Sequence, residues 1–433
     1  MSSVPAQLPA PARRRPGRLA GKGIWLAAAV LLAVLPFLFR SGTALTVMSL
    51  MGIAIIFALS YNILLGQTGM LSFGHAVYYG LGAYFTVHAM NAAVAAKLAL
   101  PLPLMPLVGG LAGLGSAAVL GWVSTPRSGT AFAMISLGLA ELVGSSSLIL
   151  PSFFGGEEGV STNRTRLLHV LGWNFGPQIQ VYYLIAAWCF VCAVLMYALT
   201  RTPFGRMCNA VRDNAERVQF VGYNPRIVRF IAFSLAGLFA GVAGSLAAID
   251  FELANAALFS AAQSGNVILA TFIGGAGHFI GPVLGAVLVT WLQSMLSDLT
   301  DVWQLYFGLL FIAAVLYAPG GLAGLIMAHR PIWRAGGIAR LIPAYGLMAV
   351  PALLIFAGAV LAIEMAAHLA GKPEEGSVIR IAGLACDTRS WEPWVLAAAA
   401  LIGGSVLVRL TWARVVAVWD RALDAARAKG YTA

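Results

Sequence analysis

Long runs of apolar residues without charge recur from Ile24 almost to the C-terminus, and they constrain this chain more than any other feature. Each run is about as long as the roughly 20 residues with which a helix crosses the ~30 Å hydrocarbon layer of a membrane. A helix can cross because it satisfies its backbone hydrogen bonds internally. Only 10% of the 433 residues are charged, against about 25% in a soluble domain. The sequence therefore predicts an all-α polytopic membrane protein.

The formal net charge of +11 would suit a nucleic-acid-binding protein, but the basic residues are not gathered on one face. They cluster between the apolar runs and at both ends, which is typical of the cytoplasmic loops of a membrane protein. An internal N-terminus places the loop with Arg127, the loop 201–229 and the segment 330–340 inside the cell. The more balanced loop 151–180 then lies outside. We therefore expect both termini in the cytoplasm and no nucleic-acid partner.

The runs predict about ten core transmembrane helices within residues 24–327 and a further pair in a C-terminal extension, 328–433, that ends in a basic cytoplasmic tail. About ten spans divide into two halves of five. Because each half has an odd number of spans, the second half would be inverted relative to the first, as in many transporters. No clear sequence repeat accompanies that symmetry. Residues 1–23, rich in Pro, Ala and Arg, are expected to form a disordered cytoplasmic tail. A cleaved signal peptide is the alternative.

Two glycine-rich segments, 66–74 and 274–281, interrupt the runs and are candidates for a path across the membrane. Dense glycine breaks helices and lets backbones approach closely, and broken helices expose backbone groups to a solute. Tight helix packing is the alternative role for any one of these glycines. The candidate path residues are Asn62, Gly66, Gln67, Thr68, Gly69, Ser72, His75, Glu141, Gly274, Gly275 and Gly277.

Glu141 is the one carboxylate well inside a predicted span. A charge at the bilayer centre costs about 2.5–3.5 kcal/mol even on the lenient insertion scale. We therefore expect this side chain to face the protein interior, to be protonated or to line a path. Neither His75 nor His278 has a carboxylate or Cys nearby in the sequence, and Cys189 and Cys192 lack a second ligand pair. No metal site is predicted.

Several motifs follow one another in an order that resembles one family. Residues 59–84, LSYNILLGQTGMLSFGHAVYYGLGAY, are similar to a Gly-Gln/Tyr-x-Gly turn, a Ser-x-Gly-His and a Gly-rich helix in LivM-type permease subunits of branched-chain amino acid ABC importers. The further matching stretches are 136–141 (SLGLAE), 155–159 (GGEEG), 274–286 (GGAGHFIGPVLGA) and 306–326 (a closing helix and Pro-Gly turn that end in APGGLAGLI). The resemblance covers about residues 44–327.

Residues 205–222, GRMCNAVRDNAERVQFVG, resemble the family's cytoplasmic coupling helix, which docks in a groove of the ATPase subunit. An apolar stripe predicts a short amphipathic helix, with the members Met207, Val211, Ala215 and Val218. Ion pairs four residues apart are expected on its solvent side, namely Arg212–Glu216 and Asp213–Arg217. A basic loop on anionic lipid is the alternative. The positions that match the family are Gly205, Arg206, Ala210, Arg212, Asp213, Asn214 and Gly222.

The stretch 215–219, AERVQ, departs from the family's pattern and leaves the identity of the partner ATPase open. No G-x-x-x-x-G-K-[ST] sequence occurs, so we expect a transport subunit without an ATPase site, an enzyme activity or a cofactor of its own. The resemblance implies a permease of the bacterial inner membrane for branched-chain amino acids or a similar small polar solute. The partners it implies are a LivH-like second permease subunit, a pair of ATPase subunits that use ATP, a periplasmic solute-binding protein and membrane lipid.

Two other functions stay open at this point. A proton-coupled secondary transporter would use Glu141 as a proton relay. A membrane scaffold without transport is the other alternative, and the broken, glycine-rich segments argue against it.

Overall fold

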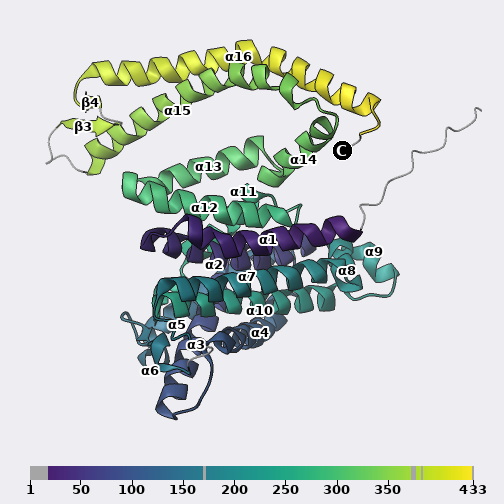
Figure 1. The fold of residues 1–433 in the computed structure, drawn as a ribbon, viewed down its shortest axis with the longest axis vertical. Coiled ribbons are helices and arrows are strands. Elements are labelled where there is room, and N and C mark those ends of the chain that lie inside the picture. Colours follow the sequence, from purple (N-terminus) through teal and green to yellow (C-terminus); the bar gives the residue numbers. More distant parts are fainter. Residues whose placement is uncertain (1–17, 169–171, 372–376, 382–383, 432–433) are drawn as a thin grey trace, which may run out of the picture. The chain divides into compact units, whose positions relative to one another are not determined.

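The computed structural model describes residues 18–168, 172–371, 377–381 and 384–431, which are nearly all helical (Figure 1). The expected class, an all-α polytopic membrane protein, is confirmed. The chain divides into two compact units. The larger unit comprises Arg15–Leu299 and Phe307–Gly324, and the smaller one includes Thr300–Tyr306 and Leu325–Ala433.

Within the described residues, 8 helices are long and apolar enough to cross a membrane, or 9 if a bent pair is one span. The bent pair is α13 (Trp303–Tyr317) and α14 (Gly321–Arg334), at 42° to each other. The other long helices are α2 (Gly42–Asn62, continued by η1, Ile63–Thr68), α4 (Met105–Ser124), α5 (Thr130–Ile149), α7 (Gln178–Arg201), α10 (Pro225–Phe251), α12 (Ile280–Leu299), α15 (Ile342–Gly371) and α16 (Trp391–Ala428).

Three more core helices are shorter or less apolar. Helix α1 (Arg18–Leu38) begins inside the segment expected to be a tail, of which residues 1–17 lie outside the described part. Helix α3 (Ala76–Ala95) carries several tyrosines and polar side chains. Helix α11 (Ala261–Gly274) has 14 residues, or about 21 Å at 1.5 Å per residue. It is therefore too short to cross ~30 Å of hydrocarbon alone.

Helix α10 packs against α4 and α3 through small residues. Two G-x-x-x-G motifs meet, because a Cβ on Gly113 would lie 2.2 Å from the Gly237 carbonyl oxygen and one on Gly241 would lie 2.2 Å from the Gly109 carbonyl oxygen. A Cβ on Gly244 would lie only 1.8 Å from the carbonyl oxygen of Tyr79 in α3. Such close approach of backbones is the usual packing mode of membrane helices. It fixes α3, α4 and α10 as one bundle.

The loop expected outside the cell is tied to the end of α10. It contains the short helix α6 (Pro151–Phe154), the 3-10 turn η3 (Arg164–Arg166) and strand β1 (Val160–Ser161), which pairs with β2 (Leu253–Ala254). Strand β2 leads into the 3-10 turn η4 (Ala256–Phe259). Another 3-10 turn, η2 (Leu102–Leu104), directly precedes α4. Gly155 and Gly159, in the GGEEG turn, have φ values of +73° and +75°.

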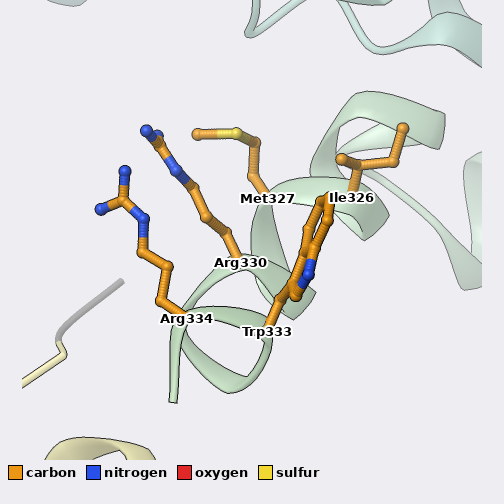
Figure 2. Close-up of a pocket in the computed structure, with 5 residues that line it drawn as sticks. All are labelled: Ile326, Met327, Arg330, Trp333 and Arg334. Carbon is orange, nitrogen blue, oxygen red and sulfur yellow. The ribbon is translucent and has the colours of Figure 1, made fainter. Parts of the chain in front are cut away.

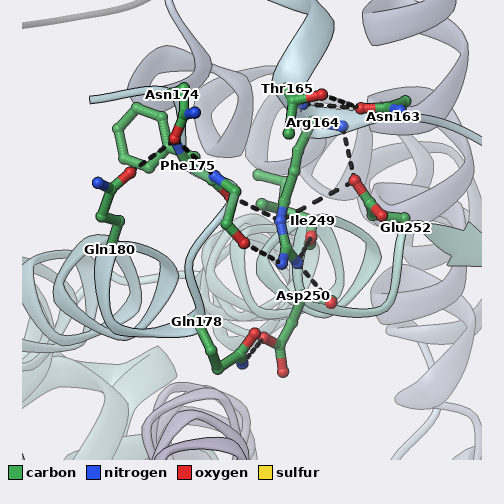
Figure 3. Close-up of polar contacts among 11 residues, drawn as sticks. Asn163, Arg164, Thr165, Asn174, Phe175, Gln178, Gln180, Ile249, Asp250 and Glu252 are labelled. Carbon is green, nitrogen blue, oxygen red and sulfur yellow. Dashed lines mark hydrogen bonds and ion pairs between the residues drawn. The ribbon is translucent and has the colours of Figure 1, made fainter. Parts of the chain in front are cut away.

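Arg164 is the centre of this attachment (Figure 3). Its guanidinium donates to the carbonyl oxygens of Phe175 at 2.8 Å and of Asp250 at 2.9 Å. The Arg164 amide donates to the Glu252 carboxylate at 2.8 Å. Phe175 and Glu252 both hold positive φ, which is strained for residues other than glycine and persists only where the surroundings enforce it. These bonds therefore hold the loop in one conformation.

In the smaller unit, α15 and α16 pack along their length and are joined by the antiparallel strands β3 (Val378–Ile381) and β4 (Leu384–Asp387). A Cβ on Gly404 would lie 2.9 Å from the Pro351 carbonyl oxygen, so small residues again set the approach. Helix α16 has 38 residues, or about 57 Å. It continues well beyond one membrane thickness, so the basic tail expected at the end of the extension is helical through Ala428. The turn η5 (Ile338–Arg340) precedes α15.

Candidate functional site

The first glycine-rich segment begins as a π-helical turn. Helix α2 continues into η1, and the Thr68 hydroxyl donates to the Leu64 carbonyl oxygen at 2.6 Å. Gly69 ends the turn with φ +68°, a conformation that glycine adopts without strain. A Cβ on Gly66 would lie 2.2 Å from Asn62 Oδ1, so only glycine fits there. Such π turns are rare in proteins overall, but many of those that occur lie at functional sites.

The structure brings the two glycine-rich segments together. A Cβ on Gly66 would lie 2.4 Å from the carbonyl oxygen of Ala276, in the turn between α11 and α12. In that turn Gly275 has φ +102°, and a Cβ there would lie 2.1 Å from the Gly320 carbonyl oxygen. A Cβ on Gly274 would lie 2.0 Å from the Gly281 carbonyl oxygen. We call residues 63–69, 274–281 and 318–321 the glycine junction.

The coupling segment, residues 205–222, lies directly against this junction. Arg212 Nη1 donates to the carbonyl oxygen of Gly66. The stem of Arg212 covers Gly69, since a Cβ there would lie 2.9 Å from Arg212 Cγ. Arg212 Nη2 and Nε also donate to Asp213 Oδ1, at 3.0 and 3.1 Å. The candidate path residues and the coupling segment, which the sequence assigned to separate roles, are therefore in direct contact.

The coupling segment is two helices rather than one. Helix α8 (Pro203–Asp213) ends before Asn214, whose φ is −162°. The Asn214 side chain accepts from the Arg217 amide at 2.9 Å and caps α9 (Ala215–Phe220). Because the break separates the expected partners, the predicted pairs Arg212–Glu216 and Asp213–Arg217 are wrong, and the described residues show Arg212 with its neighbour Asp213 instead.

One side of the coupling segment is buried against the rest of the larger unit. Val211 and Val218, of the predicted stripe, are buried, whereas Met207 and Ala215 are half-buried. Cys208 is buried on the same side, and this burial raises the pKa of its thiol to about 12. The other matched positions, Gly205, Arg206, Ala210 and Gly222, lie on α8 or just after α9.

The end of α9 exposes an apolar cluster that the sequence interpretation missed. Phe220 is 91% exposed and Val221 is 70% exposed, and Tyr223 follows them at the surface. Exposed apolar residues that are contiguous mark interaction sites more often than scattered ones do. The available signal was an F-V-G-Y run inside an otherwise polar, basic loop.

His75 and Ser72 lie in a buried aromatic cluster beside the junction. The His75 ring stacks on Phe57 at 5.3 Å, and the Tyr61 hydroxyl donates to the Ser72 carbonyl oxygen at 3.1 Å. Ser60 Oγ donates to the Phe57 carbonyl oxygen at 2.7 Å, so His75 Nε2 donates to Ser60 at 2.8 Å. His75 Nδ1 is then an acceptor.

Several buried polar atoms in and around the junction have no hydrogen-bond partner within the described part of the chain. They are Asn62 Oδ1, Gln67 Oε1, Ser72 Oγ, His75 Nδ1 and His278 Nδ1. Buried polar groups are satisfied in most native structures, and an orphan calls for an explanation such as water or a ligand. Most of these atoms are hydrogen-bond acceptors. The site is thus suited to water or to a solute that carries N–H or O–H groups.

Helix α5 is joined to the same region, but Glu141 is not. Ser136 Oγ accepts from the Phe73 amide at 3.0 Å, and a Cβ on Gly74 would lie 2.2 Å from the Ser136 carbonyl oxygen. Glu141 is exposed on another side of α5, beside Gly138, whose Cβ position is open. Of the three expectations for Glu141, an inward-facing side chain is therefore not what the isolated chain shows, whereas protonation and a path-lining role stay predictions.

Among the described residues, no group of three or more His, Cys, Asp or Glu side chains is placed to hold a metal ion. Cys189 and Cys192 are buried within α7. Nothing among the described residues around them indicates a metal-binding or redox role.

A family model described as branched-chain amino acid transport system / permease component matches residues 43–318. The chain is 28% identical to the high-affinity branched-chain amino acid transport permease protein LivM of Escherichia coli K12 over 321 residues, 69% of this chain and 74% of that protein. It is 27% identical to the autoinducer 2 import permease LsrC of Photorhabdus laumondii over 257 residues, 56% and 71% of the two chains. It is also 27% identical to the fructose import permease FrcC of Rhizobium meliloti over 205 residues, 42% and 54%. No solved structure matches the chain.

Proposed function

Because the chain belongs to the branched-chain amino acid transport system permease family, we propose that it is a translocation subunit of an ABC importer in the bacterial inner membrane. Branched-chain amino acids, or a similar small polar solute, cross beside the glycine junction. Separate ATPase subunits use the ATP on the cytoplasmic side, where both termini lie. A periplasmic solute-binding protein delivers the solute on the other side and sets most of the specificity.

The contact between Arg212 and the Gly66 carbonyl oxygen is the observation that supports this proposal most directly. ATP binding closes the ATPase pair and shifts α8 and α9. Arg212 passes the shift to η1, whose i→i+5 hydrogen bonds span one more residue than those of an α-helix and can rearrange. Energetic coupling of this kind travels through packed elements that have two arrangements. The π turn is the element that changes in this proposal.

The apolar cluster Phe220–Val221 is the anchor on the ATPase in this proposal. Burying a Val or Phe side chain contributes about 1.5–3 kcal/mol. Exposed aromatic anchors of this kind dominate many interfaces. Docking of the ATPase at the end of α9 leaves Arg212 on α8 free to contact Gly66. The ATPase thus binds α9, and its movement reaches η1 through α8.

The exposed face of α5 takes the second permease subunit. A carboxylate that faces lipid at mid-membrane costs about 2.5–3.5 kcal/mol. A protein partner with hydrogen-bond donors, or a water-filled path between the subunits, removes that cost. Gly138, next to Glu141 on this face, permits close approach. Within the described residues Glu141 has no hydrogen-bonding neighbour to continue a proton relay, so nothing favours the secondary-transporter alternative.

The orphaned acceptors at Asn62, Gln67 and His75 support a solute that donates hydrogen bonds, as the ammonium group of an amino acid does. On the opposite side, the loop fixed by Arg164 exposes Glu157 and Glu158. A fixed loop lowers the ordering cost of docking. We assign it to contact with the solute-binding protein.

The test is purification of the tagged full chain from its own membrane in mild detergent, with mass spectrometry of the proteins that come with it. We expect ATPase subunits and a second permease with the native chain. The variant Phe220→Asp with Val221→Asp should lose the ATPases and keep the second permease. Val378→Asp, which changes a valine of similar exposure in the hairpin between α15 and α16, is the matched control. Recovery of the native chain alone, where known ABC complexes survive, would refute the proposal.

A further inference from the structure

The last part of α14 carries a hollow that lies beyond the family match at residues 43–318. It has a volume of about 400 Å³ and is lined by Ile326, Met327, Arg330, Trp333 and Arg334 (Figure 2). Figure 2 shows the Arg330 and Arg334 side chains extending side by side, with Met327 next to Arg330 and with Trp333 and Ile326 on the other side. The hollow thus has a cationic end and an apolar wall.

Neither guanidinium is neutralised within the described part of the chain, where no carboxylate pairs with Arg330 or Arg334. Two like charges one helical turn apart disfavour each other. An anion between them converts that repulsion into attraction. Arginine presents a planar fork of N–H donors that matches phosphate oxygens, so this pair suits a phosphate group better than a point charge would.

The backbone that carries this pair is held from the opposite side. Ile332, between the lining residues, is fully buried against Leu341 and Ala422. Lys429 Nζ donates to the Ala335 carbonyl oxygen at 3.0 Å and ties the end of α16 to the same turn. The outward direction of Arg330 and Arg334 is therefore set by packing within the smaller unit.

A free phosphate ion would use the arginines and leave the apolar wall without a role. Trp333 is 71% exposed, and the neighbouring wall residues Ile326 and Met327 belong to the apolar part of α14. Tryptophan beside arginine at the end of a membrane helix is typical of the interface between hydrocarbon and water. Basic pockets on the cytoplasmic side of membrane helices recognise anionic lipid headgroups.

We propose that this hollow binds an anionic phospholipid of the cytoplasmic leaflet. Its phosphate lies between Arg330 and Arg334, and an acyl chain runs along Ile326, Met327 and Trp333. The C-terminal extension is then anchored to a specific lipid as well as to the membrane in general. The inference does not depend on which solute the chain transports or on its ATPase partner.

The test uses the full chain in lipid nanodiscs, followed by native mass spectrometry of the lipids that stay bound after transfer to detergent. Phosphatidylglycerol and phosphatidylcholine are supplied in equal amounts. We expect the native chain to retain phosphatidylglycerol. The variant Arg330→Gln with Arg334→Gln should retain it about tenfold less or worse, because each arginine contributes to attraction of the anionic surface.

The matched control is Arg414→Gln with Arg421→Gln, which removes the same charge from exposed positions of α16 and should retain the lipid as the native chain does. Trp333→Ala should also lower retention, whereas 10 mM inorganic phosphate (about the concentration of a common buffer) should not displace the lipid. Equal retention of both lipids by the native chain, undiminished retention in Arg330→Gln with Arg334→Gln, or equal loss in the α16 control would overturn the proposal. Displacement by inorganic phosphate, with no effect of Trp333→Ala, would assign the site to a free phosphate ion instead.

Discussion

Replacing Arg212 with methionine removes the guanidinium that joins the coupling segment to the glycine junction, and it keeps much of the side chain that covers Gly69. The Gly66 carbonyl oxygen then loses its charged donor. A hydrogen bond to a charged group contributes about 1.5–3 kcal/mol. Because about 1.4 kcal/mol corresponds to a factor of ten, solute uptake per ATP hydrolysed should fall roughly 10- to 150-fold.

The assay is uptake of radiolabelled leucine into proteoliposomes that contain the complex recovered with the chain, with ATP hydrolysis followed in the same vesicles. We expect hydrolysis to continue in Arg212→Met while uptake falls, since the exposed Phe220, the proposed anchor on the ATPase, is unchanged. Arg212→Lys, which keeps the charge but lacks the planar fork, should lie between the two. Arg127→Met, on another exposed loop arginine, is the matched control.

A native ratio of uptake to hydrolysis in Arg212→Met would refute the assignment of Arg212 as the link. The same fall in Arg127→Met would also refute it, because the effect would then follow from loss of any exposed positive charge. Loss of the ATPases from the Arg212→Met complex would instead place Arg212 in the docking surface.

Three further predictions concern single positions. Gly275→Ala should lower the thermal unfolding temperature of the purified chain, because φ is +102° and the added Cβ meets backbone, and such strain costs of order 1–3 kcal/mol; Gly277→Ala, at an open position, should not. The pKa of Cys208 is raised to about 12, so maleimide at pH 8, mapped by mass spectrometry, should label the half-exposed Cys386 and leave Cys208 unlabelled. Because the folded state favours the neutral Cys208 thiol, its contribution to the free energy of unfolding should be complete below the ordinary pKa of a thiol. That contribution should be lost as the pH rises toward about 12. Glu141→Gln should still take up solute in proteoliposomes, and uptake by the native chain should not depend on a proton gradient. If the variant fails to take up solute and a protonophore stops uptake by the native chain, the result would support the secondary transporter instead.

The sequence was sufficient to predict an all-α membrane protein and to locate several of its long helices. Apolar run length predicts a span without knowledge of its neighbours, which is why α2, α4, α7 and α10 were located. Glycines with positive φ or touching backbone, such as Gly69 and Gly275, were singled out because their chemistry is local. The inverted five-plus-five arrangement stays a prediction.

The contacts that join these segments were not predictable. Arg212 and Gly66 are 146 residues apart, and no local pattern relates a loop arginine to a carbonyl group in a membrane helix. The break at Asn214 depends on a side-chain cap that competes with a continuous helix, and the periodic stripe predicted the helix. For Glu141 the sequence left an inward-facing, a protonated and a path-lining side chain open, because the cost of a buried charge does not say which way a helix such as α5, apolar on most sides, is turned. A helix of that kind gives no sequence signal for its rotation.

The packing at the glycine junction also limits how the path can open. Gly274, Gly281 and Gly285 approach neighbouring backbone so closely that added Cβ atoms would lie 1.8–2.0 Å from carbonyl oxygens. The turn between α11 and α12 therefore moves as a body with those helices. The π turn is the softer partner, because its extra residue can be passed along the helix without breaking the chain of hydrogen bonds. In the proposed mechanism, a displacement of Arg212 would turn Asn62 and Gln67, whose buried oxygens have no hydrogen-bond partner among the described residues, and a solute with N–H or O–H groups would supply the donors that they lack.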